Sequence, residues 1–351
     1  MKDPTQHAQQ QLIEDVQHNC HISDALYARD YSLCIYLLKM REYFRWERGL
    51  AYGASLPKEE LGDWITQREA YWDALLEDEY RDLALGGDAV DPFQSERINA
   101  GLRDGGYIYS GGIGMFAKPS FFIAELDSAR QEYGYPVYIA GRELARDINA
   151  QPAMSDGHQI ILRRESLRRM LWEKLEEWGW RRQDNAMGRA LAYYPFDSDV
   201  LGALDSMTEA ETDAVIFHEV GELKAGEFLG QQWRELIAQS ARSRLELAAR
   251  AMRDHLADTW ITLPNLLERE AEASIHFYFG NLSGMRKAIY PSLMRAYERW
   301  IATGKLKYLH DALGSGLDYW QGQSAMLLAH FDRYGQEGIG ELEKRVGDIK
   351  L

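Results

Sequence analysis

The segment from residue 105 to residue 165 differs in texture from the sequence on both sides of it. Glycines, prolines and an Asp156-Gly157 pair separate its short apolar runs, which lie at 106–114, 120–124, 136–140 and 159–162. Short apolar runs between turn-forming residues are typical of β-strands. We therefore predict an antiparallel or mixed sheet of three or four short strands here, with one short helix, Arg142 to Ile148, opening after Gly141.

The rest of the chain has the periodicity of helices. One apolar stripe begins after Ser23, a favoured N-cap residue, and comprises Leu26, Leu33, Leu37, Met40 and Phe44. A second helix is expected from Pro57 to Gly86-Gly87, and a shorter one after Pro92. After Arg164 the helical patterns continue to the end of the chain. There, Thr208-Glu209-Ala210-Glu211 has the form of a capping box that starts a helix.

These patterns predict a mainly α protein of the α+β class, bundle-like and with a small β-sheet element in its first half. We expect three regions: an N-terminal helical region, 1–104, a small β-rich element, 105–165, and a C-terminal helical domain, 166–351.

Composition and charge limit the classes of protein that fit. The 351 residues include 40 Lys and Arg against 55 Asp and Glu, which gives a formal net charge of −15. This charge disfavours a nucleic-acid partner. No apolar run is long enough to span a membrane, and the polar N-terminus does not resemble a signal peptide. Only Cys20 and Cys34 are present, so we expect a cytoplasmic, bacterial-type protein without disulfides.

One basic run is a candidate nucleic-acid-binding patch despite the negative net charge. It comprises Arg163, Arg164, Arg168, Arg169, Lys174, Arg181 and Arg182. Acidic residues interleave with it, so we interpret it as a solvated helix face with i,i+4 ion pairs rather than a binding patch.

The segment Phe217-His218-Glu219-Val220-Gly221-Glu222 places three potential metal ligands on one helix. His218 and Glu222 are four residues apart and share a face, whereas Glu219 projects about 100° away. The segment departs from the zincin motif H-E-x-x-H because Glu222 replaces the second histidine, so iron or manganese suits it as well as zinc. Gly221 costs about 1 kcal/mol in a helix interior, which predicts that a neighbouring helix or ligand approaches it closely.

Two further helical segments carry comparable pairs. Asp254 and Asp258 are four apart, and so are Glu272 and His276. Carboxylate and histidine pairs on separate helices build the di-metal sites of helical bundles, although the spacings here differ from the usual Glu-x-x-His. We predict that His218, Glu222, Asp258 and His276 converge, with Asp254 and Glu272 as further candidate ligands.

The leading functional hypothesis is a metal-dependent enzyme that holds iron, manganese or zinc between helices. Glu219 would then be a group supporting the ligands or the catalytic base that activates a metal-bound water. The alternative is a non-enzymatic helical module that binds a small ligand or a protein partner, because abundant Trp and Tyr suit interfaces as well as cores.

Two other features carry weaker indications. The Gly111-Gly112-Ile113-Gly114 loop, with Arg142 and Arg146 as helpers, could bind an anion, but a plain connection between strands is favoured. Cys20-His21 has no partner motif, and Cys34 lies in an apolar stripe and is predicted to be core.

Four short segments resemble an uncharacterised family of bacterial proteins, of the domain-of-unknown-function kind. They are Ser23-Asp24-Ala25-Leu26-Tyr27-Ala28, Lys118-Pro119-Ser120-Phe121-Phe122, His218-Glu219-Val220-Gly221-Glu222 and Gly284-Met285-Arg286-Lys287. The resemblance implies a soluble, mostly helical bacterial protein and no particular activity.

Overall fold

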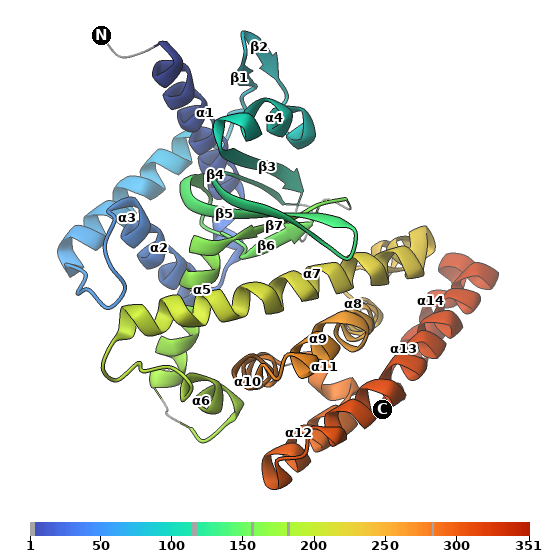
Figure 1. The fold of residues 1–351 in the computed structure, drawn as a ribbon. Helices are drawn as coiled ribbons and strands as arrows, with labels where there is room; N and C mark the ends of the chain where they lie inside the picture. The colour runs from blue at the N-terminus through green and yellow to red at the C-terminus, as the bar shows by residue number, and fades with distance from the viewer. Residues whose placement is uncertain (1–3, 114–117, 156–157, 181–182, 283) are drawn as a thin grey trace. The chain divides into compact units, whose positions relative to one another are not determined.

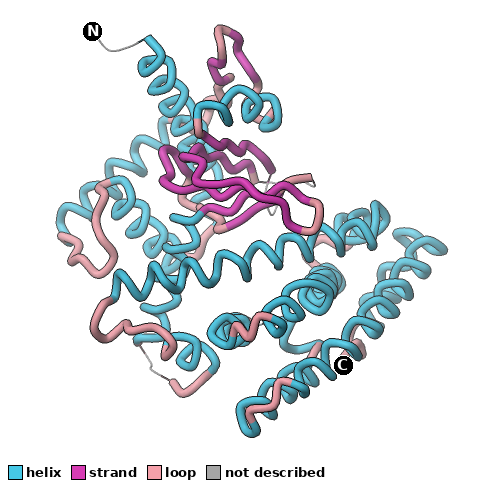
Figure 2. The backbone as a smooth tube through the Cα atoms, viewed as in Figure 1, coloured by secondary structure: helices cyan, strands magenta, loops and turns pink. Residues whose placement is uncertain are grey.

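The computed structural model describes residues 4–113, 118–155, 158–180, 183–282 and 284–351. The chain divides into two compact units, Met1–Glu173 and Lys174–Leu351, which we call the N-terminal and C-terminal domains. The expected mainly α fold with a small sheet in the first half is confirmed (Figures 1 and 2).

In the N-terminal domain, helices precede and follow a set of strands. The elements are α1 (Pro4–Tyr27), α2 (Leu33–Glu47), α3 (Lys58–Ala74), β1 (Leu83–Leu85), β2 (Asp88–Val90), α4 (Ser95–Leu102), β3 (Tyr107–Ile113), β4 (Pro119–Glu132), β5 (Tyr135–Arg146), β6 (Ala153–Ser155), β7 (Ile160–Arg163) and α5 (Arg164–Gly179).

The predicted mixed sheet is present, but it has five strands rather than three or four, in the order β3-β4-β5-β7-β6 (Figure 1). The sheet is mixed, because β5 and β7 pair in parallel and the other neighbours are antiparallel. The predicted Asp156-Gly157 turn and Gly114 lie outside the described residues. Gly111 to Ile113 belong to β3, and the N–H of Gly111 donates to Ser95 Oγ at 2.8 Å.

The helix predicted from Arg142 to Ile148 is wrong, because β5 continues through Arg146. The pairing of β5 with β4 is irregular here, because Glu143 and Ala145 face consecutive residues of β4, Ala124 and Ile123, and this shift brings Glu143 and Arg146 to the same face. Glu143 and Arg146 both point into the interior, where they pair with each other. Arg142 is exposed and pairs with Glu125 on the neighbouring strand.

Helix α1 packs along the sheet and is longer at its start than the sequence patterns suggest. Leu12, Val16 and Cys20 share a core with Phe121 and Ile123 of β4. Ser23, the predicted N-cap, lies instead within α1. Inside the helix the Ser23 side chain is buried, and its hydroxyl oxygen lies 3.3 Å from the hydroxyl oxygen of Tyr80.

The stripe that the sequence assigned to the core divides between core and surface. Met40 and Phe44 of α2 are buried, but Leu33 is 70% exposed and Leu37 is 45% exposed. Cys34 is also exposed, so its predicted place in the core is wrong. The buried side chains of α2 lie in its C-terminal half, where Met40, Tyr43 and Phe44 share a core with residues of α1 and α3.

Helix α3 begins after Pro57, as predicted, but ends at Ala74. The chain then forms the β1–β2 hairpin, in which Gly86 and Gly87 supply the turn. Both have positive φ, 60° and 96°, a conformation that glycine adopts without steric cost.

The C-terminal domain is helical. Its elements are α6 (Ala186–Leu191), α7 (Val200–Gln239), α8 (Arg244–Ala257), a π-helical turn (Asp258–Thr262), α9 (Leu263–Glu268), α10 (Glu272–Asn281), α11 (Gly284–Ile289), α12 (Pro291–Thr303), α13 (Lys307–Tyr334) and α14 (Ile339–Arg345).

Helix α7 begins earlier than the capping box predicted. Asp199 is the N-cap, and its carboxylate accepts the N–H of Gly202 at 2.9 Å. Thr208 lies two turns inside the helix, where its hydroxyl donates to the carbonyl of Leu204, so it caps nothing. Asp is a favoured N-cap residue, and the residues between Asp199 and Thr208 are compatible with a helix, so the helix begins at the earlier cap.

The predicted close approach at Gly221 is confirmed. A Cβ atom added to Gly221 would lie 2.7 Å from the carbonyl oxygen of Ala257, at the end of α8. Glycine therefore lets α7 and α8 pack with their backbones almost in contact.

In the part of the chain that the structure describes, no helix combines the length and apolar character needed to cross a membrane.

Candidate functional site

The predicted metal-ligand segment lies in a cluster of charged side chains in the C-terminal domain. His218 Nδ1 lies 3.1 Å from Asp258 Oδ1, and His218 Nε2 lies 3.5 Å from Glu222 Oε1. The π-helical turn carries Asp258, which is fully buried. Four of the six predicted ligands, His218, Glu222, Asp254 and Asp258, meet here.

Two arginines complete the cluster and neutralise its carboxylates. Arg253 pairs with Glu222 at 2.9 Å, and Arg286 pairs directly with Asp258 and lies 3.8 Å from Asp254. The Tyr278 hydroxyl also donates to Asp258 at 2.8 Å. Asp258 is therefore buried with a full set of partners.

The contacts in the cluster shift the pKa values of His218, Glu219 and Glu222 in different directions. Burial alone would lower the pKa of His218, but its bonds to Asp258 and Glu222 outweigh burial and raise it well above the usual value. Burial and then the charge of Glu222 raise the pKa of Glu219, the predicted catalytic residue, to about 7. Burial would likewise raise the pKa of Glu222, but His218 and Arg253 lower it to about 2.

Glu272 and His276 lie apart from this cluster. Glu272 accepts a hydrogen bond from the Tyr193 hydroxyl at 2.5 Å. His276 Nδ1 lies 2.9 Å from the Tyr297 hydroxyl, and its ring stacks on Trp300 with centroids 4.7 Å apart. The structure thus brings together the pairs on α7 and α8 but not the pair on α10.

Within the cluster, nitrogen and oxygen atoms meet one another directly rather than around a common point. Among the described residues, no group of three or more His, Cys, Asp or Glu side chains is arranged to hold a metal ion. His–carboxylate and Arg–carboxylate pairs satisfy these groups as they stand.

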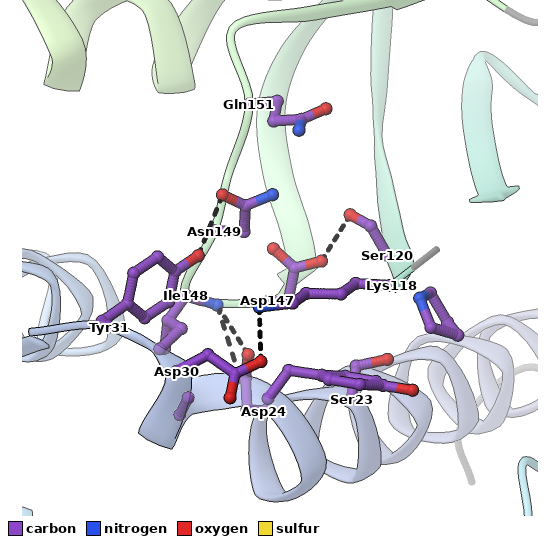
Figure 3. Close-up of a pocket in the computed structure, with 13 residues that line it drawn as sticks. Ser23, Asp24, Asp30, Tyr31, Lys118, Ser120, Asp147, Ile148, Asn149 and Gln151 are labelled. Carbon is purple, nitrogen blue, oxygen red and sulfur yellow. Dashed lines mark hydrogen bonds and ion pairs between the residues drawn. The ribbon is translucent and has the colours of Figure 1, made fainter. Parts of the chain in front are cut away.

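A second candidate site is a pocket of about 230 Å³ in the N-terminal domain (Figure 3). Its walls come from the end of α1, the start of β4 and the segment after β5. The lining residues are Ser23, Asp24, Tyr27, Ala28, Asp30, Tyr31, Lys118, Pro119, Ser120, Asp147, Ile148, Asn149 and Gln151.

Two buried carboxyl groups dominate this pocket. Asp147, 2% exposed, accepts hydrogen bonds from the Ser120 hydroxyl at 2.5 Å and from the N–H groups of Phe121 and Ala150 at 3.2 Å and 2.9 Å. Asp24, 4% exposed, accepts a hydrogen bond from the N–H of Ile148 and from no other group in the described part of the chain. Among the described residues, neither carboxylate has an ion pair within 4 Å.

The segment after β5 is held tightly against this pocket. Lys39 and Arg169 both donate to the carbonyl of Asn149, and Arg169 also donates to the carbonyl of Ala150. Ala150 has φ of 43°, a left-handed conformation that is uncommon without glycine and recurs at functional sites. The lining is therefore organised before any ligand arrives.

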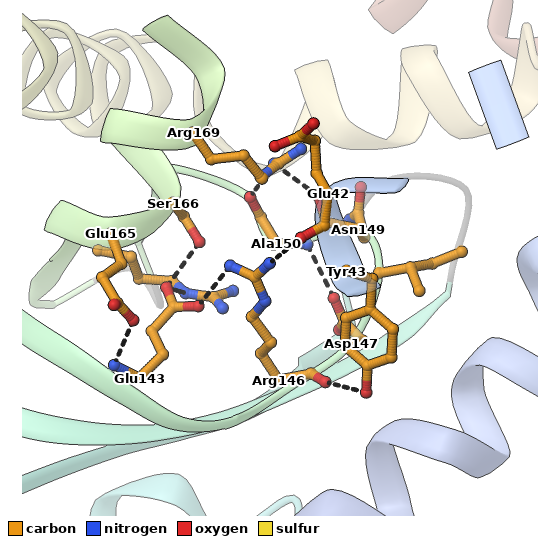
Figure 4. A network of polar contacts seen from close by, with 12 residues as sticks. Glu42, Tyr43, Glu143, Arg146, Asp147, Asn149, Ala150, Glu165, Ser166 and Arg169 are labelled. Atoms are coloured by element: carbon orange, nitrogen blue, oxygen red, sulfur yellow. Dashed lines mark hydrogen bonds and ion pairs between the residues drawn. The ribbon is translucent and has the colours of Figure 1, made fainter. Parts of the chain in front are cut away.

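A buried ion network fixes the base of this segment (Figure 4). Glu143 accepts hydrogen bonds from Arg163 at 2.9 Å, Ser166 at 2.6 Å and Arg146 at 3.2 Å, and joins β5, β7 and α5. Burial alone would raise the pKa of Glu143, but the two guanidinium groups lower it to about 2. Arg146 directly precedes Asp147, so the network positions the carboxyl group in the pocket.

Comparison with known families places both domains. Residues 11–163 match the N-terminal domain, and residues 168–348 the C-terminal domain, of a family of unknown function, DUF6866. The chain belongs to this family. No curated protein and no solved structure matches it. The expected membership of a family without an assigned activity is confirmed.

Sequence reasoning missed the N-terminal pocket. Asp24 and Ser120 lie in segments that carried the family resemblance, but nothing in their spacing indicated that they meet. Asp147 was assigned to a helix, which would have turned it differently. A signal was present in Asp147-Ile148-Asn149-Ala150, where polar residues follow a strand and precede a turn.

Proposed function

We propose that the N-terminal domain binds a small organic cation, an ammonium compound, in the pocket formed by Asp24 and Asp147. The observation that carries this proposal is the pair of buried carboxyl groups facing one cavity without an ion pair among the described residues. Burying carboxylates without a counter-charge is costly, and an ammonium group entering the pocket would supply that charge.

The pocket also suits the rest of such a ligand. The Lys118 ammonium pairs with Asp30 at 2.7 Å and lies 5.6 Å and 5.9 Å from the ring centroids of Tyr27 and Tyr31. These rings already accommodate one ammonium group by cation–π contact. Since Lys118 neutralises Asp30, the charge left unpaired at the pocket is negative.

The fixed lining supports binding as well. Bonds from Lys39, Arg169 and Asp147 hold residues 147–150 in place, so little ordering remains to oppose association. The proposal develops the ligand-binding alternative predicted from the sequence and gives it a location and a ligand charge.

Calorimetric titration of the full chain tests this function. Propylammonium chloride is expected to bind, whereas propanol and propionate, which match its size but lack its charge, are not. Asp147→Asn should weaken propylammonium binding at least about tenfold, or 1.4 kcal/mol, and the exposed Asp104→Asn should leave it unchanged. Equal binding of propylammonium and propanol would contradict the proposal without relying on any variant.

The metal-dependent enzyme stays a prediction for the C-terminal cluster. A metal ion there would have to displace Arg253 or Arg286 from Glu222 or Asp258. Elemental analysis of protein purified without a metal-affinity tag tests it. Near-stoichiometric iron, manganese or zinc that is lost in Asp258→Asn would support it, and metal-free protein that takes up none of these ions would contradict it.

A further inference from the structure

We infer that the pocket exchanges a proton for its ligand: the empty pocket keeps one proton on the carboxyl group of Asp24, and the incoming ammonium group displaces it. This inference rests on the proposed function, since it concerns the same ligand in the same pocket. It adds a second participant, the proton, and predicts how binding depends on pH.

The arrangement of the two carboxyl groups is the first argument. Asp24 accepts the N–H of Ile148, the residue that directly follows Asp147, so both groups are held against the same short stretch of backbone. Both are nearly inaccessible to solvent. Two buried carboxyl groups that share a site without a counter-charge are not both ionised, because each charge disfavours the other.

The hydrogen bonds decide which group keeps the proton. Asp147 accepts three hydrogen bonds, two from backbone N–H groups and one from Ser120. Hydrogen bonds of this kind stabilise the ionised form of a carboxyl group. Within the described ranges Asp24 accepts from a single N–H, that of Ile148. Burial, followed by the charge of Asp147, raises the pKa of Asp24 well above the usual range.

The other charged and titratable groups around Asp24 do not reverse this assignment. Lys39 of α2 and Arg68 of α3 lower its pKa, but by less than burial and Asp147 raise it. Lys39 is directed to the carbonyls of residues 148 and 149, and burial lowers its own pKa to about 8. Further titratable neighbours of Asp24 are Cys20, Tyr31, Tyr36, Tyr43 and Tyr80, and burial is the first cause that raises the pKa of each.

The exchange itself is a simple acid dissociation. The O–H bond of Asp24 breaks, its proton goes to solvent, and the carboxylate that remains pairs with the ligand's N–H⁺ group. Since one proton leaves for each ligand bound, the dissociation constant rises about tenfold for each pH unit below the range in which Asp24 ionises. Above that range it becomes independent of pH.

Calorimetry from about pH 5.5 to about pH 8.5 tests the exchange, because propylammonium stays protonated there as the lysine side chain does. Titrations in two buffers with different ionisation enthalpies count the protons released. We expect close to one proton per ligand at the acidic end. Asp24→Asn mimics a carboxyl group that cannot give up its proton, so it should bind propylammonium more weakly than the wild type does near pH 8.5, with an affinity that is independent of pH and with no proton released.

The outcomes separate the two proposals. If propylammonium does not bind at any pH, the proposed function fails and the exchange fails with it. If it binds with a flat pH profile and no proton release, the function stands and the exchange is wrong. If Asp24→Asn still releases a proton, the proton comes from another group, and the assignment to Asp24 is overturned.

Discussion

Glu143 shows how much one buried side chain contributes to the N-terminal domain. It is fully buried between Arg163 and Arg146, so neutralising it leaves two buried guanidinium groups without an anion. We expect Glu143→Gln to lower the free energy of unfolding by about 3–5 kcal/mol at neutral pH. Urea denaturation followed by circular dichroism measures this change.

The matched control is Glu125→Gln, which removes an exposed carboxylate that pairs with Arg142. An exposed pair contributes about 0–1 kcal/mol. The pKa of Glu143 is lowered to about 2 in the folded protein, so its contribution is present above the unfolded value and is lost as the pH falls towards about 2. A Glu143→Gln protein as stable as Glu125→Gln would show that the network is dispensable.

Asp24 has the opposite linkage to pH. Because burial raises its pKa in the folded protein, folding retains a proton that the unfolded chain gives up, and stability falls as the pH rises above the unfolded value. Asp24→Asn avoids this loss. Its melting temperature should exceed that of the wild type by at least about 2 °C near pH 8, and the difference should shrink towards pH 5.

Differential scanning calorimetry at several pH values measures this difference, and the exposed Asp104→Asn serves as the control. A gap between Asp24→Asn and the wild type that grows as the pH is lowered would contradict the expected sign.

Individual residues were predictable from the sequence where their role is local. A close approach at position 221 was predicted because Gly is unfavourable inside a helix and therefore indicates a packing requirement, and the structure confirms this approach. The basic run beginning at Arg163 was interpreted as a solvated face, but Arg163 and Arg169 are buried. Arg169 does make the expected i,i+4 pair with Glu173, whereas the partner of Arg163 lies on another strand, beyond what local spacing can indicate.

Helix packing in the C-terminal domain gives a test at the scale of the element. In Gly221→Ala the new methyl group would meet the backbone of Ala257, which cannot move as a flexible side chain can. We expect a loss of about 1–3 kcal/mol in the free energy of unfolding, as is usual for overpacking. Chemical denaturation measures it.

The same helix provides the control. Gly226 has open space where its Cβ would lie, so Gly226→Ala should stabilise the protein by about 0.5–1 kcal/mol through helix propensity. If both variants are stabilised, the close approach of α7 and α8 does not constrain position 221.

The elements were predicted well in kind and poorly at their ends. The sheet and most helices follow from apolar periodicity. The segment 142–148 was predicted as a short helix opening after Gly141, but residues through Arg146 pair with β4 as the end of β5, a long-range contact that local sequence does not indicate. Thr208 and Glu211 match a capping box in composition, but Asp199 starts α7 earlier.

At the scale of the whole molecule, two domains imply two folding units. The match to the N-terminal family domain ends at residue 163, and the match to the C-terminal family domain begins at residue 168. The two compact units divide nearby, after Glu173. We expect fragments 1–179 and 184–351 each to fold alone. Each should give a helical far-ultraviolet circular dichroism spectrum and a cooperative thermal transition. A fragment 184–351 that melts without cooperativity would contradict the independence of the C-terminal domain.

The candidate sites were only partly predictable at this scale. His218, Glu222, Asp254 and Asp258 were found because each pair has helical spacing and α7 lies against α8. Their arginine partners were missed, since Arg253 of α8 pairs with Glu222 of α7 and Arg286 comes from α11, and both contacts depend on how the helices pack. The N-terminal pocket depends on Asp24 and Asp147, which come together only through the packing of α1 against the sheet.

Because of the π-helical turn at Asp258–Thr262, the charged cluster around Asp258 depends on the number of residues in this turn as well as on their identity. Such a turn accommodates one residue more than the α-helical register, and one residue rotates everything after it by about 100°. The side chains of α8 and α9 therefore have a fixed phase difference. Deleting a single residue here would keep nearly every side chain, yet Asp258 could remain beside His218 only if Leu266 and Leu267 rotated out of their buried positions.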